Sequence, residues 1–389
     1  MNLAGITNEG EFYSQHYLGE KLSDDLSGVL DAWGERETQS REAAKAQGGR
    51  EPDWRTPHAV LASISREALR QLEALRRPQS PRERLIAGRA LLQQLLRNFD
   101  LPYEPVRQPL TEDGDLELPL LGELRNAQGE PLLWVLEAQA LEDVDDLDAD
   151  PLSLKVHAQQ LLSLSATPVP RALQGADAPD WQKLLSTIVF TQARPPRWVL
   201  LVSPWQWVLL DRTKFAQHRL LRFDWVELFS RRETETLKGA SVLLHRDSLL
   251  NAQGLSLLDT LDENAHKHAY GVSEDLKYAL RESIELLGNE AARQLVEQAR
   301  EDQKGIFTGA RALDPGDLSL ECLRYMYRLL FLFYIEARPE LGYAPVDSDV
   351  YLRGYSLESL RDLELVPLTT QAERDGHYLH HSMSAPIQI

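Results

Sequence analysis

The residues with the clearest chemical potential lie between Asp115 and Gln139. Two apolar, strand-like segments in this stretch carry acidic residues, and the second ends in Trp134-Val135-Leu136-Glu137-Ala138-Gln139. Side chains alternate between the two faces of a strand, so Glu137 and Gln139 are expected to point to the same side. Glu123 ends the first segment, and a hairpin between the two segments would bring Glu123 and Glu137 near one divalent cation. Carboxylate oxygens are ligands that suit Mg²⁺.

The segments around these acids predict a β-hairpin. Residues 116–124 have a strand pattern, and Asn126-Ala127-Gln128-Gly129 has the composition of a turn, with a glycine available for a positive φ angle. A simpler interpretation is a half-buried hairpin whose carboxylates face solvent. The spacing of the acids alone favours that simpler interpretation, so the neighbouring elements have to be considered.

The order of the neighbouring elements is that of an α/β sandwich. Residues 82–99 form an apolar stripe at helical spacing and include Glu83, a further acid that could reach Glu137. Residues 181–189 predict a second helix, and residues 198–202 and 205–210 predict two strands. We therefore expect an α/β domain over residues 57–230, although many α/β domains share this order of elements.

The acidic hairpin resembles the PD-(D/E)xK nuclease family, whose pattern is an acid on one strand and then Glu or Asp, any residue and Lys on the next. Gln139 stands where that family has lysine, as in some restriction endonucleases of the superfamily. The resemblance implies an Mg²⁺-dependent endonuclease in which Glu123, Glu137 and Gln139 are catalytic and Glu123, Glu137 and Asp115 hold the metal. The bound cation would activate water and stabilise charge on the phosphate.

Composition limits the other functions. The 389 residues are 43% hydrophobic, and no apolar run is long enough for a membrane span. The N-terminus lacks a secretory signal pattern, and the lone Cys322 suits a reducing cytoplasm and a small core residue in a helix. We therefore expect a cytoplasmic protein with no membrane partner.

The net charge of −18 argues against strong DNA binding by this chain alone. Acids cluster between Glu142 and Asp150, which is typical of a solvated loop, and arginines gather between Arg66 and Arg97 and between Arg212 and Arg232. The arginines could contact phosphate, although surface salt bridges on helices are their commoner use. DNA mimicry is a third, weaker interpretation of the acidic charge.

The remaining segments predict two flanking regions. Residues 1–56 read as an N-terminal helical segment over 11–33 followed by a mobile linker, and residues 231–389 read as an all-α connector with helices over 273–287 and 319–337. Two histidine groups lie in the connector, His266 with His268 and three near the end of the chain. Without accompanying cysteines they do not indicate a structural metal site.

Four segments look like the N-terminal region of large bacterial class I DNA adenine methyltransferases, including type IIG restriction-modification enzymes and the methyltransferase of DISARM phage-defence systems. The segments are residues 5–18, 244–248, 261–278 and 327–338, and the likeness covers nearly the whole chain. In that family a nuclease-like domain and a helical connector precede the methyltransferase and target-recognition domains. The resemblance implies DNA as a partner through the full-length protein, and defence-system proteins as possible further partners.

The motifs of methyl transfer do not occur in this sequence. The family binds S-adenosylmethionine with a Gly-rich loop and holds the flipped adenine with an Asn/Asp-Pro-Pro-aromatic motif. The only Pro-Pro pair stands in Arg194-Pro195-Pro196-Arg197, without the amide and the aromatic residue. We therefore expect S-adenosylmethionine to bind only in a methyltransferase domain outside this chain, and the chain to be a fragment or a truncated form.

Two functions of different class remain open from the sequence. The chain is either an Mg²⁺-dependent endonuclease domain, or a catalytically degenerate scaffold that couples the methyltransferase to partner defence proteins. A carboxylate within metal-bridging reach of Glu137 would favour the endonuclease. The missing lysine and the crowded acids favour the scaffold.

Overall fold

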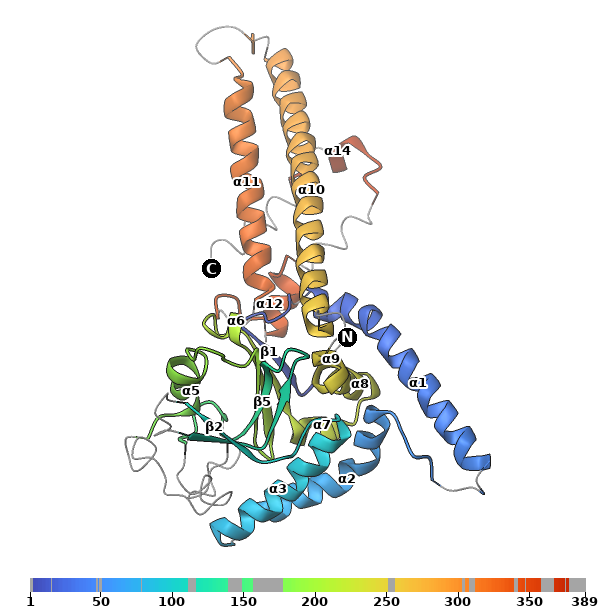
Figure 1. Ribbon diagram of the computed structural model, residues 1–389. Coiled ribbons are helices and arrows are strands. Elements are labelled where there is room, and N and C mark those ends of the chain that lie inside the picture. Colours follow the sequence, from blue (N-terminus) through green and yellow to red (C-terminus); the bar gives the residue numbers. More distant parts are fainter. Residues whose placement is uncertain are drawn as a thin grey trace. The chain divides into compact units, whose positions relative to one another are not determined.

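The computed structural model describes residues 3–14, 16–46, 48, 51–77, 79–110, 117–138, 149–156, 178–250, 256–302, 305–307, 312–338, 342–346, 348–357, 367–374 and 376–377. The chain divides into two compact units, Met1–Tyr270 and Gly271–Ile389. The first unit contains the strands of the protein that are described and the helices that pack around them (Figure 1). Its elements are β1 (Ile6–Glu9), η1 (Tyr17–Lys21), α1 (Leu22–Ala46), α2 (Pro57–Leu75), α3 (Pro81–Asn98), β2 (Val106–Pro109), β3 (Glu117–Leu120), β4 (Gly122–Arg125), β5 (Pro131–Glu137), α5 (Trp181–Leu184), η3 (Leu185–Val189), β6 (Trp198–Val202), β7 (Gln206–Asp211), α6 (Arg212–Phe215), β8 (Leu220–Asp224), α7 (Trp225–Arg231), α8 (Thr234–Leu244), α9 (Arg246–Leu249) and the start of α10 (Leu257–Glu301).

The first unit is a mixed α/β structure built on a six-stranded sheet with the strand order β1-β8-β7-β6-β5-β4. The β5–β6 pair is parallel, and the other pairs of this sheet are antiparallel. A parallel pair needs a crossover connection, and α5 lies in the segment that joins β5 to β6. The expected α/β class is therefore confirmed.

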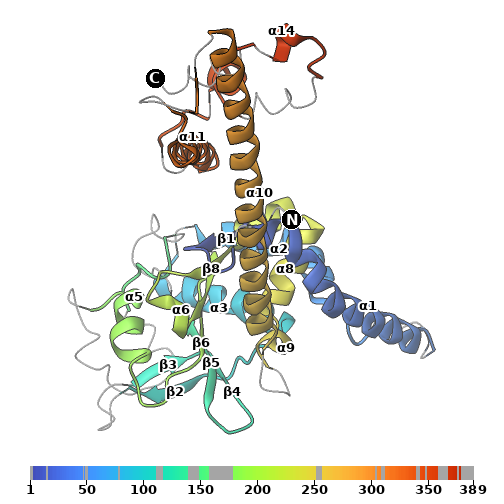
Figure 2. The same ribbon diagram turned by 90° about the horizontal axis from the view of Figure 1, so that it is seen from above.

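Two apolar cores cover the two faces of the sheet. Alternate residues of β5 enter different cores, with Leu133 and Val135 in one and Trp134 and Leu136 in the other. Helices α2, α3, α7 and α8 pack on the first face, and α5 with η3 packs on the second. Figures 1 and 2 show α5 and α8 on opposite sides of the sheet. The alternation predicted for this strand is confirmed, because each face of the sheet is buried against helices.

The strand predicted over residues 116–124 is two strands in different sheets. β3 pairs with β2 in a two-stranded sheet, whereas β4 pairs with β5 in the main sheet. The break falls at Leu121 and Gly122. A Cβ atom at Gly122 would lie 2.2 Å from the carbonyl oxygen of Pro102, so only glycine lets the backbone approach Pro102 this closely.

The N-terminal region differs from the prediction of a helix over 11–33 followed by a mobile linker. The α-helix α1 continues to Ala46, because residues 35–46 are rich in good helix formers even though few of them are apolar. Before it, Glu11 has a φ of 58° and Tyr17–Lys21 forms a π-helical turn. Phe12 and Tyr13 are buried in the first core, as expected of a packed aromatic face.

The boundaries predicted at 56 and 230 do not match the compact units. β1 pairs with β8, so residues before 57 belong to the main sheet. Helix α8 buries Leu237, Leu243 and Leu244 in the first core, so residues after 230 belong to the same unit. The boundary lies instead at Tyr270, within α10.

The second unit is helical in the part of it that the structure describes. It holds the rest of α10, α11 (Pro315–Glu336), α12 (Asp349–Gly354) and α14 (Gln371–Arg374). Cys322 is the buried residue of α11 and faces α10, since its sulfur would lie 3.8 Å from a Cβ atom at Gly288. Among the described helices, including the 45-residue α10 and the 22-residue α11, none is long and apolar enough to cross a membrane.

Candidate functional site

The strongest candidate site lies at the end of β5, where Glu137 meets Arg89 of α3. The Glu137 side chain is only 5% exposed and that of Arg89 is 12% exposed. The Nε atom of Arg89 donates a hydrogen bond of 2.8 Å to Oε2 of Glu137, and the Nη2 atom donates to the same oxygen. The two side chains therefore form a buried, charge-assisted ion pair.

Helix α3 positions Arg89, and strand β5 positions Glu137. Ser80 caps α3 through a capping box with Glu83, which fixes the first turn of the helix. Leu85, Leu92 and Leu96 of α3 are buried, and Arg89 lies four residues after Leu85 on the same side of the helix. Glu137, the last residue of β5, pairs with Val202 of the neighbouring strand β6. The packing that buries the helix thus also presents Arg89 to the strand.

The electrostatic setting of Glu137 is dominated by its burial. Loss of water raises the pKa of the Glu137 carboxyl, and the hydrogen bonds and charge of Arg89 oppose that rise without cancelling it. Tyr103 lies close enough to respond to both groups. Burial raises the pKa of Tyr103, with Glu137 adding to the rise and Arg89 opposing it. Arg89 therefore stabilises the ionised form of the buried Glu137 carboxyl.

Glu123 lies on the opposite face of the sheet from Glu137. Glu123 stands directly opposite Trp134 in the β4–β5 pair, and Trp134 Nε1 donates a hydrogen bond of 3.0 Å to Glu123 Oε1. Its other carboxylate oxygen accepts from Gln108 Nε2 at 2.9 Å and from Arg125 Nε at 3.0 Å. Because Glu137 is an odd number of residues from Trp134, it points the other way. In this register the two carboxylates lie on opposite faces of the sheet, so the β4–β5 hairpin does not bring Glu123 and Glu137 together as expected.

Among the residues that the structure describes, no other predicted site residue brings a second carboxylate to Glu137. Asp115 and Gln139 lie outside the described residues. Glu83 accepts hydrogen bonds from the backbone N–H and the hydroxyl of Ser80 as part of the helix cap, at 3.1 and 2.8 Å. β4 begins at Gly122 opposite Val135, so this strand ends before it comes level with Glu137. Across the described ranges, no three His, Cys, Asp or Glu side chains gather in a way that could hold a metal ion.

The histidines of α10 take part in local contacts. His266 Nε2 lies 3.7 Å from Asp262 Oδ1, and the ring of His268 stacks on Tyr17 with 6.0 Å between the ring centroids. Asp262 is itself paired with Lys214, whose ammonium group also donates to the carbonyl of Phe12 at 3.0 Å. These polar contacts join the start of α10 to the N-terminal segment and α6, which is a structural role.

Arg89 is the site residue that the sequence interpretation did not identify. A signal for it exists, because a charged residue interrupts the apolar stripe of α3 between Leu85 and Leu92. A charge in the buried stripe of a helix requires a partner of opposite sign. Glu137 is the acid that fulfils this requirement.

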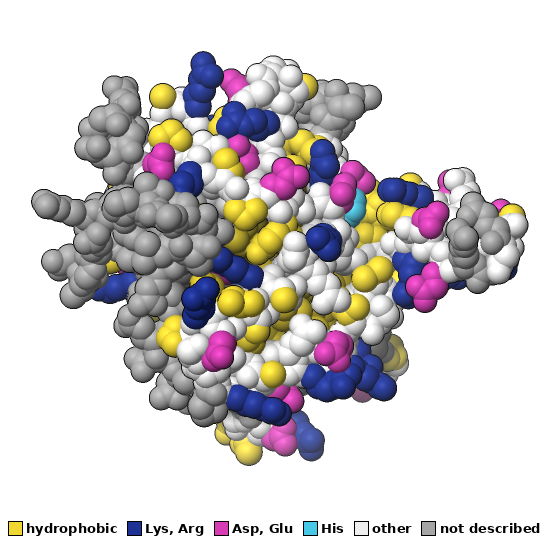
Figure 3. Space-filling model, turned by 60° about the horizontal axis from the view of Figure 1, so that its bottom comes forward, with side chains coloured by type: hydrophobic (Ala, Val, Ile, Leu, Met, Phe, Trp, Pro, Cys, Tyr) yellow, Lys and Arg dark blue, Asp and Glu magenta, His cyan; other side chains and the backbone are white. Residues whose placement is uncertain are grey.

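A second feature of the first unit is the basic helix pair α2–α3, whose members pack against each other. Residues 57–98 contain eight arginines and three glutamates, with no lysine or aspartate, and so carry a net charge of +5. Since the whole chain carries −18, the other residues carry −23. Arg66, Arg70, Arg77, Arg82 and Arg97 are exposed. Figure 3 views the molecule from the side on which these helices lie and shows Lys and Arg side chains spread among apolar and acidic ones.

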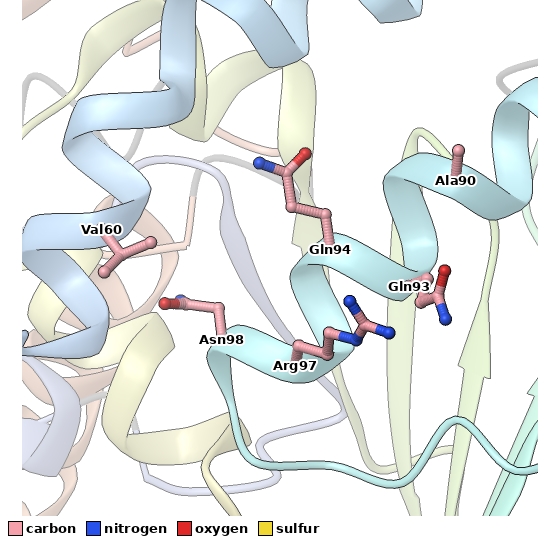
Figure 4. A pocket seen from close by; sticks show the side chains of 6 residues that line it. All are labelled: Val60, Ala90, Gln93, Gln94, Arg97 and Asn98. Atoms are coloured by element: carbon pink, nitrogen blue, oxygen red, sulfur yellow. The ribbon is translucent and has the colours of Figure 1, made fainter. Parts of the chain in front are cut away.

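An open pocket of about 370 Å³ lies between α2 and α3. More of its lining surface is apolar than polar, and the lining comes from Val60, Ala90, Gln93, Gln94, Arg97 and Asn98. Figure 4 shows Asn98 directed across the gap toward Val60, and Asn98 Nδ2 donates a hydrogen bond of 3.1 Å to the carbonyl of Pro57.

Comparison with known proteins gives no match: no family model, no curated protein and no solved structure is similar to this chain.

Proposed function

We propose that this chain is the nuclease-like and connector portion of a bacterial DNA restriction-modification or phage-defence methyltransferase, and that it acts as a catalytically degenerate scaffold. The resemblance of its four segments to that family supports the assignment. The mixed sheet, with a helix before the β4–β5 hairpin and a crossover to the parallel strand β6, is compatible with a PD-(D/E)xK-type core. In this proposal the methyltransferase domain that binds S-adenosylmethionine lies outside the chain, and the protein works in the cytoplasm.

The observation that carries the scaffold role is the ion pair between Arg89 and Glu137. A nuclease of this type needs Glu137 as a ligand of Mg²⁺, together with a second carboxylate on the same face. The positive guanidinium group of Arg89 takes the place beside Oε2, and Glu123 belongs to the other face. The described residues therefore do not fit an Mg²⁺ site, and we assign Glu137 to the stability of the fold.

The scaffold is proposed to contact DNA through the α2–α3 helix pair. Its exposed arginines would meet the phosphate backbone. Such contacts position a protein on a duplex without reading its sequence. Sequence recognition would then belong to another domain, and defence-system proteins are the further partners that a scaffold implies.

DNA binding by this helix pair predicts a strong dependence on salt. With about four phosphate contacts, the affinity for a labelled duplex should fall about 100-fold between 50 and 200 mM NaCl. Replacing Arg66, Arg70, Arg77 and Arg82 with glutamine should remove most of the binding at low salt and flatten the salt dependence. Fluorescence anisotropy with a duplex of unrelated sequence measures both quantities.

The matched control changes the same number of charges in the second unit, as Arg281, Arg300, Arg324 and Arg328 to glutamine, and these arginines are exposed. It should bind DNA as the unchanged protein does. Equal losses in the two quadruple variants would contradict the assignment to α2–α3. A DNA affinity that does not change with salt concentration would contradict any phosphate-contacting surface.

A further inference from the structure

Helix α11 has apolar side chains on two opposite sides, and within the described part of the second unit one of these sides is packed while the other is exposed. Cys322 is buried, and Tyr325, Leu329 and Leu332 follow on the same side as half-buried residues. The opposite side carries an apolar stripe that is exposed along the helix. The stripe consists of Leu320, Leu323, Tyr327, Phe331 and Tyr334. A contiguous exposed apolar surface of this kind commonly marks an interaction site, so a covering partner is expected over this stripe.

The spacing of the stripe is symmetric about its central residue. Tyr327 is 71% exposed. Leu323 and Phe331 lie four residues before and after it, and Leu320 and Tyr334 lie seven residues before and after it. When two such helices run antiparallel and cross at Tyr327, Leu323 of one meets Phe331 of the other, and Leu320 meets Tyr334. The stripe is therefore complementary to a second copy of itself.

We propose that this stripe, the α11 stripe, is the interface of a homodimer with twofold symmetry in which two α11 helices pack antiparallel. A twofold interface uses the same patch on both subunits, which is the property that the symmetric spacing provides. Apolar residues that recur at intervals of three and four positions are the pattern by which helices interdigitate. This inference goes beyond the proposed function and does not depend on it.

The size of the stripe is sufficient for a dimer. Its three aromatic and two leucine side chains offer on the order of 600 Å² of exposed surface per chain, so two copies would bury on the order of 1,200 Å². That is the lower end of the range for specific interfaces and fits an affinity in the micromolar range.

Charge does not oppose this contact. The stripe itself is uncharged, and at its edge Arg324 Nη1 lies 2.6 Å from Glu321 Oε1 of the same helix. A dimer would also place aromatic anchors at the centre of the interface, where truncation has its largest effects.

Sedimentation velocity on the full chain tests the proposal. The protein should change from a 44.2-kDa monomer to a particle of twice that mass as its concentration rises through the micromolar range. Tyr327→Glu brings two carboxylates together at the twofold axis and should raise the dissociation constant at least about a hundredfold. Tyr278→Glu, which alters a tyrosine of α10 that is 67% exposed, should leave the dimer unchanged. Circular dichroism should confirm that both variants are folded.

A cross-link gives an independent readout. In a Cys322→Ser background, Tyr327→Cys should form an intermolecular disulfide under mild oxidation, because the two copies of residue 327 face each other. Tyr278→Cys in the same background should not. A chain that stays monomeric at about 100 µM overturns the proposal. So does a dimer that tolerates Tyr327→Glu, or one that Tyr278→Glu disrupts equally.

Discussion

Replacing Arg89 with methionine is expected to lower the free energy of unfolding by about 3–5 kcal/mol at neutral pH. The substitution removes both hydrogen bonds to Glu137 Oε2 and the positive charge of Arg89 from beside a carboxylate that is only 5% exposed. Urea denaturation followed by tryptophan fluorescence measures the change. Several tryptophans of the first unit, including Trp207 and Trp225, are fully buried, so their emission should report loss of this core.

The cost of Arg89→Met should depend on pH, and its sign follows from the raised pKa of Glu137. A carboxyl whose pKa is higher in the folded state than in the unfolded state destabilises the fold when it is ionised. That destabilisation is fully present above the folded-state pKa and disappears below the unfolded-state value near 4.5. Removing Arg89 raises the folded-state pKa further, so the difference between variant and parent should shrink as the pH is lowered from 8 toward 4.5.

Glu137→Gln combined with Arg89→Met should recover much of the lost stability, because the buried charge is then gone. The pH dependence of the Arg89→Met variant should disappear with it. Arg82→Met, at an exposed position of the same helix, serves as the control and should change stability by less than about 0.5 kcal/mol. A loss below about 1 kcal/mol for Arg89→Met would contradict a buried ion pair.

Trp225→Ala is expected to cost about 3–5 kcal/mol of the free energy of unfolding. The Trp225 ring is fully buried and lies 5.1 Å from the ring of Trp207, 5.2 Å from Phe229 and 6.0 Å from Phe99, measured between centroids. These contacts join α7 to β7 and to the end of α3. The cavity left by alanine would therefore loosen the layer that also positions Arg89.

The conservative variant Trp225→Phe keeps an aromatic ring and should cost less than half as much as alanine. Unfolding curves monitored by circular dichroism compare the two variants without relying on the fluorescence of the altered residue. Equal costs for the two would contradict a role based on ring packing. Stability within about 0.5 kcal/mol of the parent for Trp225→Ala would contradict the buried position itself.

The sequence predicted β5 well, because the alternation of its side chains between the two faces of the sheet depends only on local strand geometry. Leu133 and Val135 enter one core and Trp134 enters the other, as a period of two requires. The face of Glu123 was not predictable from the same pattern, because it depends on the register of β4 against β5. A shift of one residue turns a side chain to the other face, and the pair contains an irregularity at Leu124/Arg125 that the turn residues do not reveal.

Among the helices too, features set by the local sequence were predicted, and features set by tertiary packing were not. The predicted helix over residues 319–337 is α11, Pro315–Glu336, because its apolar residues and Pro315 mark it clearly. Residues 273–287 are only part of α10, whose 45 residues continue through polar segments that carry no amphipathic signal. The connector was predicted over residues 231–389, but Leu243 and Leu244 near its start pack in the first core of the sheet unit. No local pattern specifies this contact.

Titration calorimetry with Mg²⁺ and Mn²⁺ tests the central claim most directly, namely that Glu137 is committed to Arg89 and not to a metal ion. The experiment compares the parent protein with Glu137→Gln, which keeps the shape of the side chain and removes its charge. We expect any heat of binding to be the same in both proteins, because Arg89 and not a cation neutralises Glu137. Saturable binding by the parent that Glu137→Gln abolishes would contradict this account and restore the endonuclease function.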